Sequence, residues 1–298
     1  MAARFEGTYT ALVTPFREDE SIDWDAFDAL VDVQIAEGVS GLVPCGTTGE
    51  SPALSHEEQV AVIARTVRRA NKRAHVCAGA GSNSTREAVH LAREAERAGA
   101  DAVMIVVPYY NKPTQDGLVR HYVTVARAVT CPIVVYNIPG RTGIDLLPDA
   151  LGKILDGAPN VVAVKEATGN VLRAQELVRR FGSRLTVLSG DDALTLPMVA
   201  TGARGVISVT SNLLPGAVSR ATHLALAGDV EGARRAHLAL LPVHAAMFLE
   251  SNPAPVKAAL AMRGVMRDVV RGPLIAASPE TRAALAATLA AYEKAEAR

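Results

Sequence analysis

One lysine draws attention because it closes an apolar run. Of the six lysines in the chain, Lys165 alone ends a segment, VVAVK, that reads as a buried strand. Burial favours the neutral amine over the ammonium, and a neutral amine can attack a ketone to form an imine. The alternative is a structural lysine that pairs with Glu166 or with another carboxylate. The spacing alone therefore leaves imine chemistry and a structural ion pair both open.

Two further segments carry side chains suited to such chemistry. Tyr136 ends the apolar run PIVVY, and its phenol could pass a proton to or from an imine. A core tyrosine with a satisfied hydroxyl is the simpler interpretation of this residue taken alone. The segment CGTTGES, residues 45–51, offers backbone amides and the hydroxyls of Thr47 and Thr48, which could bind a small carboxylate or relay protons. An ordinary turn between a strand and a helix would have a similar composition.

Other reactive side chains point to less specific roles. The glycines around Arg141 predict a loop after the fifth strand, residues 137–143, where its guanidinium could bind a carboxylate or stay solvated. Asp191 and Asp192 precede a helix-like stretch, so we expect them to cap its N-terminus rather than bind a metal. The histidines show no spacing typical of metal ligands, and metal catalysis is not expected. The cysteines adjoin apolar runs and are expected to be small buried side chains: Cys45, Cys77 and Cys131.

Composition sets broad limits on the class of protein. Of the 298 residues, 49 % are hydrophobic, which is enough for a large core, and the formal net charge is zero. A chain without a basic stripe is a poor candidate for binding nucleic acid. The N-terminal segment lacks the apolar stretch of a signal peptide, and no segment reaches the roughly 18 apolar residues that a membrane-spanning helix needs. We therefore expect a cytoplasmic protein without a membrane partner.

Elements that could position these residues follow a βα pattern, in which short apolar runs alternate with longer segments of helical period. Most runs lack polar alternation, as expected of parallel strands covered on both faces. Helices are predicted at 24–38, 55–70 and 84–100, the last two with the Ser-x-x-Glu spacing of a capping box at Ser55 and at Ser84. The predicted strands are residues 8–15, 41–46, 74–80, 101–108, 132–137, 160–167, 184–190 and 204–209.

Eight such units predict a closed (β/α)8 TIM barrel. An open, doubly wound sheet is the alternative, but residues 79–84 lack the third glycine of its phosphate-binding loop. We expect the barrel at 1–228 and a C-terminal helical extension at 229–298. In such barrels the active site lies at the C-terminal ends of the strands, where the polar residues named above should converge. Four helices are predicted after the eighth strand, near 215–227, 229–250, 253–265 and 279–296.

Eight motifs occur together and in order along the chain. They are TALVTPF (10–16), GTTGES (46–51), VPYYNKPTQDG (107–117), YNIPGRTG (136–143), VKEATGN (164–170), SGDD (189–192), GVISV (205–209) and NPAPVK (252–257). With them, over nearly its whole length, the chain resembles the dihydrodipicolinate synthase family, within the pyruvate-dependent N-acetylneuraminate lyase superfamily. The co-occurrence of the motifs makes this resemblance far more specific than any single motif.

The resemblance implies a Schiff-base mechanism. Lys165 matches the family lysine that condenses with pyruvate, and Tyr136 matches the tyrosine that acts as its acid and base. Thr47 matches the threonine that links this tyrosine into a proton relay. Tyr110 matches a relay tyrosine that is contributed across a tight-dimer interface. No cofactor is implied, and members of the family are commonly homotetramers built from two tight dimers.

The resemblance also implies the two substrates, pyruvate and L-aspartate 4-semialdehyde, and a place in diaminopimelate and lysine biosynthesis. Thr48 matches the threonine that holds the pyruvate carboxylate, and Arg141 matches the arginine that receives the aldehyde. Gly190 and Ile207 match positions that contribute backbone groups near the lysine. Sialic-acid lyases of the superfamily usually lack this arginine, so Arg141 is the main feature against an N-acetylneuraminate or 2-keto-3-deoxy-sugar-acid lyase. A non-catalytic binding barrel is the more distant alternative, because it should have lost the lysine or the tyrosine.

Feedback inhibition by L-lysine is a further expectation from the resemblance. Members inhibited by lysine bind it in a crevice at the tight-dimer interface, where a glutamate could pair with its ammonium. Gln59 departs from the histidine found in some sensitive members. A capping box at Ser84 is a competing role for that glutamate. The positions that match the crevice are Ser51, His56, Asn83, Glu87 and Tyr109.

Overall fold

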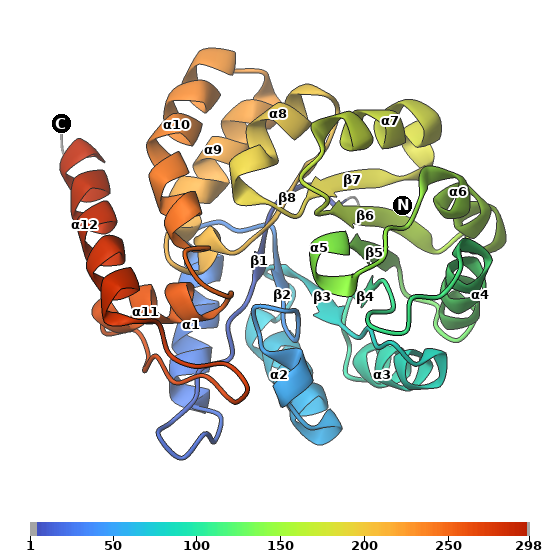
Figure 1. Ribbon diagram of the computed structural model, residues 1–298, viewed down its shortest axis with the longest axis horizontal. Helices are drawn as coiled ribbons and strands as arrows, with labels where there is room; N and C mark the ends of the chain where they lie inside the picture. The colour runs from blue at the N-terminus through green and yellow to red at the C-terminus, as the bar shows by residue number, and fades with distance from the viewer. Residues whose placement is uncertain (1–4, 297–298) are drawn as a thin grey trace.

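Eight parallel strands pair in chain order and close into a barrel in the computed structural model, which describes residues 5–296 (Figure 1). The predicted fold class and all eight predicted strands are confirmed. Each strand is shorter than its apolar run, because residues beyond the ladder, such as Leu12 and Val13, are buried outside the sheet. The strands are β1 (Gly7–Ala11), β2 (Gly41–Val43), β3 (His75–Gly79), β4 (Ala102–Val106), β5 (Ile133–Asn137), β6 (Val161–Glu166), β7 (Thr186–Ser189) and β8 (Gly205–Ser208).

Side chains along each strand alternate between the barrel interior and the layer beneath the helices. In β5, Val134 and Tyr136 belong to the interior cluster, whereas Val135 packs in the outer core. In β6, Ala163 belongs to the interior cluster, so Lys165, two residues further on, faces the interior as well. Tyr136 and Lys165 lie opposite each other in the register of β5 and β6. The alternation of β6 therefore places the amine inside the barrel.

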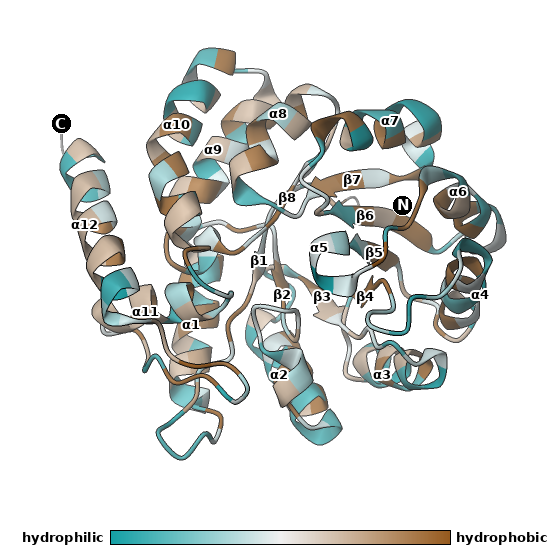
Figure 2. Ribbon diagram, in the orientation of Figure 1, coloured by the Kyte–Doolittle hydropathy of each residue, from teal (hydrophilic) through white to brown (hydrophobic). Residues whose placement is uncertain are grey.

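Helices cover the outside of the barrel and alternate with the strands along the chain (Figure 1). Figure 2 shows hydrophobic residues along β5, β6 and β7 and hydrophilic residues on the outer side of α7. Burial of one face against the strands is the main contribution of such amphipathic helices to stability. The helices of the first seven units are α1 (Trp24–Ala36), α2 (His56–Ala70), α3 (Thr85–Arg97), α4 (Gln115–Ala126), α5 (Pro139–Thr142), α6 (Pro148–Gly157), α7 (Val171–Phe181) and α8 (Thr195–Ala200).

The two predicted capping boxes have different outcomes. At the start of α2, Ser55 and Glu58 bond reciprocally, as predicted. At the start of α3, Ser84 accepts a hydrogen bond from the amide of Glu87, but the carboxylate does not return one. It contacts Ser82 and His56 instead, so the capping box predicted at Ser84 is wrong, because a hydroxyl and an imidazole compete successfully for the carboxylate.

The C-terminal helices begin with α9 (Pro215–Ala227), which packs against β1 and β8. They continue with α10 (Val230–Ala246), α11 (Ala254–Met262) and α12 (Pro279–Glu296), and α10 lies between α9 and α12 (Figure 1). All four predicted C-terminal helices are confirmed. The division into a barrel and an extension at 228/229 stays a prediction, and its outer limits, 1 and 298, lie outside the described residues. Within residues 5–296, no helix is long and apolar enough to cross a membrane.

Candidate active site

Lys165 is buried at the C-terminal end of β6, with 4 % of its surface exposed. Its Nζ atom lies 4.2 Å from the centroid of the Tyr136 ring. Among residues 5–296 the amine takes part in no ion pair and in no hydrogen bond. An amine inside an apolar barrel without a counter-ion is the arrangement that favours attack on a carbonyl carbon.

Glu166 does not serve as the counter-ion of Lys165. It occupies the next position of β6 and therefore faces the opposite side of the strand. Its Oε1 accepts a hydrogen bond from Thr168 N at 2.7 Å, and within the described chain Oε2 has no partner. Burial raises the pKa of the Glu166 carboxyl above its ordinary value. The interpretation of Lys165 as half of a pair with Glu166 is therefore wrong, because the pleat of the strand separates the two side chains.

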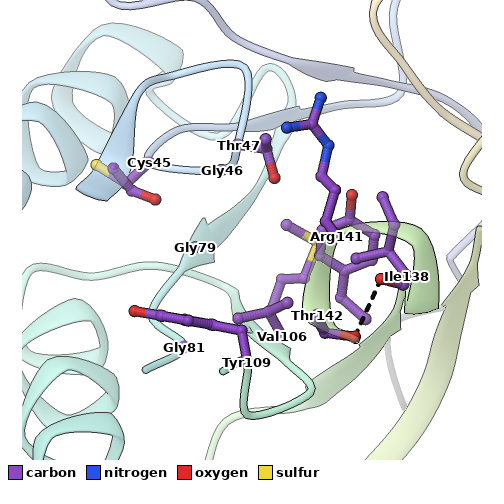
Figure 3. A pocket seen from close by; sticks show the side chains of 13 residues that line it. Cys45, Gly46, Thr47, Gly79, Gly81, Val106, Tyr109, Ile138, Arg141 and Thr142 are labelled. Atoms are coloured by element: carbon purple, nitrogen blue, oxygen red, sulfur yellow. Dashed lines mark hydrogen bonds between the residues drawn. The ribbon is translucent and has the colours of Figure 1, made fainter. Parts of the chain in front are cut away.

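A cavity of about 150 Å³ opens beside Tyr136. Thr47, from the segment after β2, and Tyr136 and Arg141, from the end of β5 and from α5, line it together. Figure 3 shows the Arg141 side chain extending from α5 toward Thr47. No hydrogen bond joins Thr47 to Tyr136 in the described part of the chain. The other residues predicted for catalysis and substrate binding do not line this cavity: Lys165, Tyr110, Thr48, Gly190 and Ile207.

Arg141 lies on a single helical turn, α5, and not in the irregular loop expected from the glycines. Its neighbour Thr142 is buried, and the single proton of its Oγ1 hydroxyl is shared between the carbonyl of Ile138 at 3.0 Å, drawn in Figure 3, and that of Ile144 at 2.8 Å. These bonds fix the turn, while the guanidinium is exposed and, across residues 5–296, forms no ion pair. A fixed backbone with an unpaired cation at the cavity suits recognition of an anionic substrate.

The threonine segment after β2 has an unusual backbone. Cys45 and Glu50, at φ +56° and +55°, both adopt the left-handed conformation that costs a non-glycine residue about 1–2 kcal/mol. Gly79 makes room for the first of them, since a Cβ there would lie 2.1 Å from the carbonyl oxygen of Cys45. Residues 45–51 therefore need contacts from outside the segment to hold this shape.

Two residues that sequence reasoning left without a role supply these contacts. Lys257, fully buried in α11, forms an ion pair with the Glu50 carboxylate and donates to Val269 O at 2.8 Å. Burial lowers the pKa of Lys257 below its ordinary value, and Glu50 opposes that shift. Asn252 donates from Nδ2 to Thr48 Oγ1 at 3.0 Å. In the sequence, a lysine within the apolar segment PVKAAL was the one signal that could have identified the ion pair of Lys257 with Glu50.

The remaining predicted residues lie in three places: beside the end of β6, inside the barrel and on the surface. Gly190 N donates to Glu166 O at 2.8 Å, and a Cβ on Gly190 would lie 2.6 Å from that of Ala167, so only glycine fits beside this strand end. Ile207 belongs to the apolar cluster of the barrel interior. Tyr110 is 88 % exposed and has a left-handed backbone conformation at φ +72°.

Residues matched to a lysine-binding crevice fall into two groups. Ser51 and Tyr109 line the same cavity as Tyr136. In the second group, His56 Nε2 lies 2.7 Å from Glu87 Oε1, and Asn83 O accepts from Asn111 Nδ2 at 2.9 Å. Hydrogen bonds from Ser82 and His56 lower the pKa of the Glu87 carboxyl, which keeps it anionic.

The acidic pair after β7 and the cysteines have simple structural roles. Asp191 caps the short 3-10 helix Asp192–Leu194 through Ala193 N, as expected. Asp192 is not a cap, because its buried carboxylate accepts from Ser208 Oγ and from Val209 N, which fixes the turn after β8. Of the three cysteines expected to be buried, two are and the third is half-buried: Cys45, Cys77 and Cys131.

Fold and site together define a class: a (β/α)8-barrel enzyme that can form a Schiff base on a buried lysine. The Dihydrodipicolinate synthetase family model matches residues 4–292, and the chain belongs to this family. The resemblance seen in the motifs is thereby confirmed, as is the prediction of an enzyme.

Similar proteins agree over nearly the full length. A 4-hydroxy-tetrahydrodipicolinate synthase of Sorangium cellulosum is 60 % identical over 288 residues, which cover 96 % of each chain. The dihydrodipicolinate synthase of Acinetobacter baumannii, solved in complex with pyruvate, is 41 % identical at a TM-score of 0.95, over 97 % of this chain and 99 % of that one. The enzyme of Cyanidioschyzon merolae, solved with lysine bound, is 35 % identical at a TM-score of 0.94, over 97 % and 98 %.

Proposed function

We propose that this chain condenses pyruvate with L-aspartate 4-semialdehyde, the 4-hydroxy-tetrahydrodipicolinate synthase reaction for which its relatives are named. The observation that carries the proposal is the buried, unpaired amine of Lys165 beside the ring of Tyr136. The guanidinium of Arg141 at the cavity supports a second substrate that is anionic. The reaction belongs to diaminopimelate and lysine biosynthesis.

Covalent capture of pyruvate is the first step. The neutral amine of Lys165 attacks the keto carbon, and the resulting carbinolamine loses water to give a protonated imine. The Tyr136 phenol supplies and removes the protons of these steps. Thr47 and Tyr110 would relay protons between this phenol and solvent, with Tyr110 reaching the site of a second copy. The 88 % exposure of Tyr110 suits that role.

Carbon–carbon bond formation follows from the imine. Loss of a methyl proton converts the imine into an enamine, whose carbon attacks the aldehyde carbon of the semialdehyde. The amino group of the extended product then attacks the imine carbon, which closes a ring and releases Lys165. Thr48 would hold the pyruvate carboxylate, and Arg141 the carboxylate of the semialdehyde. Gly190 and Ile207 would offer backbone groups near the lysine.

Arg141 provides the sharpest test of substrate choice. Arg141→Ala should raise the KM for the semialdehyde at least tenfold, because a charge-assisted hydrogen bond to a carboxylate contributes about 1.5–3 kcal/mol. The KM for pyruvate should change little. A coupled assay that compares aspartate semialdehyde with sugar aldehydes measures both, and Arg179→Ala, on the outer helix α7, is the matched control. Unchanged semialdehyde kinetics in Arg141→Ala, or a preference for sugar aldehydes in the wild type, would contradict the proposal.

Inhibition by L-lysine and the assembly of the chain are also proposed, from the resemblance to the family. L-lysine would bind near Glu87, whose anionic carboxylate can pair with its ammonium. The relative solved with lysine bound supports this assignment. We further propose a homotetramer of two tight dimers in the cytoplasm. A rate that does not fall with L-lysine up to millimolar concentration would dispose of the effector site, and sedimentation of the purified protein measures the assembly.

A further inference from the structure

Asn252 joins the C-terminal part of the chain to the threonine segment after β2. It precedes α11, and its Nδ2 donates to Thr48 Oγ1 at 3.0 Å. Both residues are buried, with 5 % and 2 % of their surfaces exposed, so water does not compete for this bond. The contact spans 204 residues of sequence.

The direction of this bond decides what the Thr48 hydroxyl can do. A hydroxyl has one proton to donate and two lone pairs that accept. Because Thr48 Oγ1 accepts from Asn252, its proton is not directed at the amide. Within residues 5–296, Thr48 donates no hydrogen bond through this hydroxyl, so the proton remains available to an anion.

The segment that carries Thr48 is also held in place. Glu50 is tied to Lys257 by a fully buried ion pair, and its second oxygen accepts from Arg271 N at 2.9 Å. Both partners come from the region beyond residue 250, as Asn252 does. The hydroxyl therefore cannot reorient by a movement of the backbone without breaking a buried ion pair.

We propose that Asn252 is a positioning residue for the keto-acid substrate: its amide holds the Thr48 hydroxyl with the proton turned toward the substrate carboxylate. The proposal rests on the proposed function, in which Thr48 binds that carboxylate. It gives the C-terminal helical region a part in substrate binding, although the lysine and the tyrosine both lie in the barrel.

A double-mutant cycle tests whether Asn252 acts through Thr48. The variants are Asn252→Ala, Thr48→Val and the two combined, and the readout is the pyruvate concentration that gives half-maximal borohydride trapping on Lys165. Asn252→Ala should raise this concentration roughly tenfold or more, with unchanged trapping at saturating pyruvate. In the Thr48→Val background the same change should add nothing, because the interaction is already absent.

Asn252→Asp separates orientation of the hydroxyl from packing. Aspartate keeps the shape but offers only acceptors, so Thr48 would donate to it and lose its free proton. The half-saturating concentration should then exceed that of Asn252→Ala, whereas a packing role predicts a smaller effect. The proposal would be overturned if folded Asn252→Ala or folded Asn252→Asp had the same half-saturating pyruvate concentration as the wild type. It would also be overturned if adding Asn252→Ala to Thr48→Val raised that concentration further. A wild type that traps no pyruvate would instead refute the proposed function.

Discussion

We propose that two buried residues on neighbouring strands carry the chemistry of the molecule. Lys165 and Tyr136 lie opposite each other on β6 and β5, and both face the barrel interior. The Nζ atom of Lys165 lies 4.2 Å from the centroid of the Tyr136 ring, so the face of the ring offers the buried amine a favourable contact. This pairing explains why a lysine is tolerated inside the barrel.

Tyr136→Phe tests the acid and base role at the residue scale. The substitution keeps the ring against Lys165 and removes only the hydroxyl, so the fold should be unaffected. We expect imine formation to slow by roughly 10²–10⁴-fold, the range typical of a lost acid or base. Stopped-flow or quenched borohydride trapping measures the rate. Tyr122→Phe, a buried tyrosine whose hydroxyl bonds Ile105 O, is the matched control and should leave the rate unchanged. A Tyr136→Phe enzyme with wild-type rates would exclude the role.

Contacts between distant elements shape the site as much as the strands do. The segment after β2 keeps its left-handed residues because α11 and the chain before it supply an ion pair and an amide. The sequence showed both motifs, GTTGES and NPAPVK, but not that they touch, because 207 residues separate Glu50 from Lys257. Local periodicity carries no information about such a contact.

Lys257→Met tests the buried ion pair at the element scale. Removing the ammonium leaves the Glu50 carboxylate buried without a counter-ion, so we expect a loss of about 3–5 kcal/mol in the free energy of unfolding. Urea denaturation measures it. Lys153→Met, which breaks an exposed pair with Asp116, should cost about 1 kcal/mol or less. The double variant Glu50→Gln with Lys257→Met should recover most of the loss. If Lys257→Met and Lys153→Met lowered the free energy of unfolding equally, the buried pair of Lys257 with Glu50 would not stabilise the fold.

At the scale of the whole molecule, the sequence predicted the architecture better than the details of the site. Continuous apolar runs identified all eight strands, since a strand covered on both faces needs apolar residues throughout. The position of Lys165 at a strand end followed from the same pattern. The helical turn at Arg141, the contacts of Asp192 and the true partners of Glu87 did not follow, because each depends on which side chains meet in three dimensions.

Buried histidines should make the folded molecule sensitive to acid. Burial lowers the pKa of His121 from its ordinary value to about 4. Between about pH 6.5 and 4 the unfolded chain therefore binds a proton that the folded chain does not, so stability falls as the pH falls through this range and is unaffected above it. At pH 4 the free energy of unfolding is lower by roughly 3 kcal/mol because of His121.

His121→Asn provides the comparison for this prediction. The amide can still bond Thr85 Oγ1, which lies 3.0 Å from the histidine Nδ1, but it takes up no proton. The free energy of unfolding, measured by urea denaturation at pH 7.5 and at pH 4.5, should fall by roughly 2–3 kcal/mol less in this variant than in the wild type. The same fall in both proteins would mean that His121 does not titrate as its burial requires.

Mass spectrometry after reduction with borohydride tests the central claim most directly. Incubated with pyruvate and reduced, the wild-type protein should gain one pyruvate-derived adduct per chain, and peptide mapping should place it on Lys165. Lys165→Ala should gain none and lose nearly all turnover. A protein that gains no adduct, or that carries it on Lys257, the other buried lysine, would contradict the account.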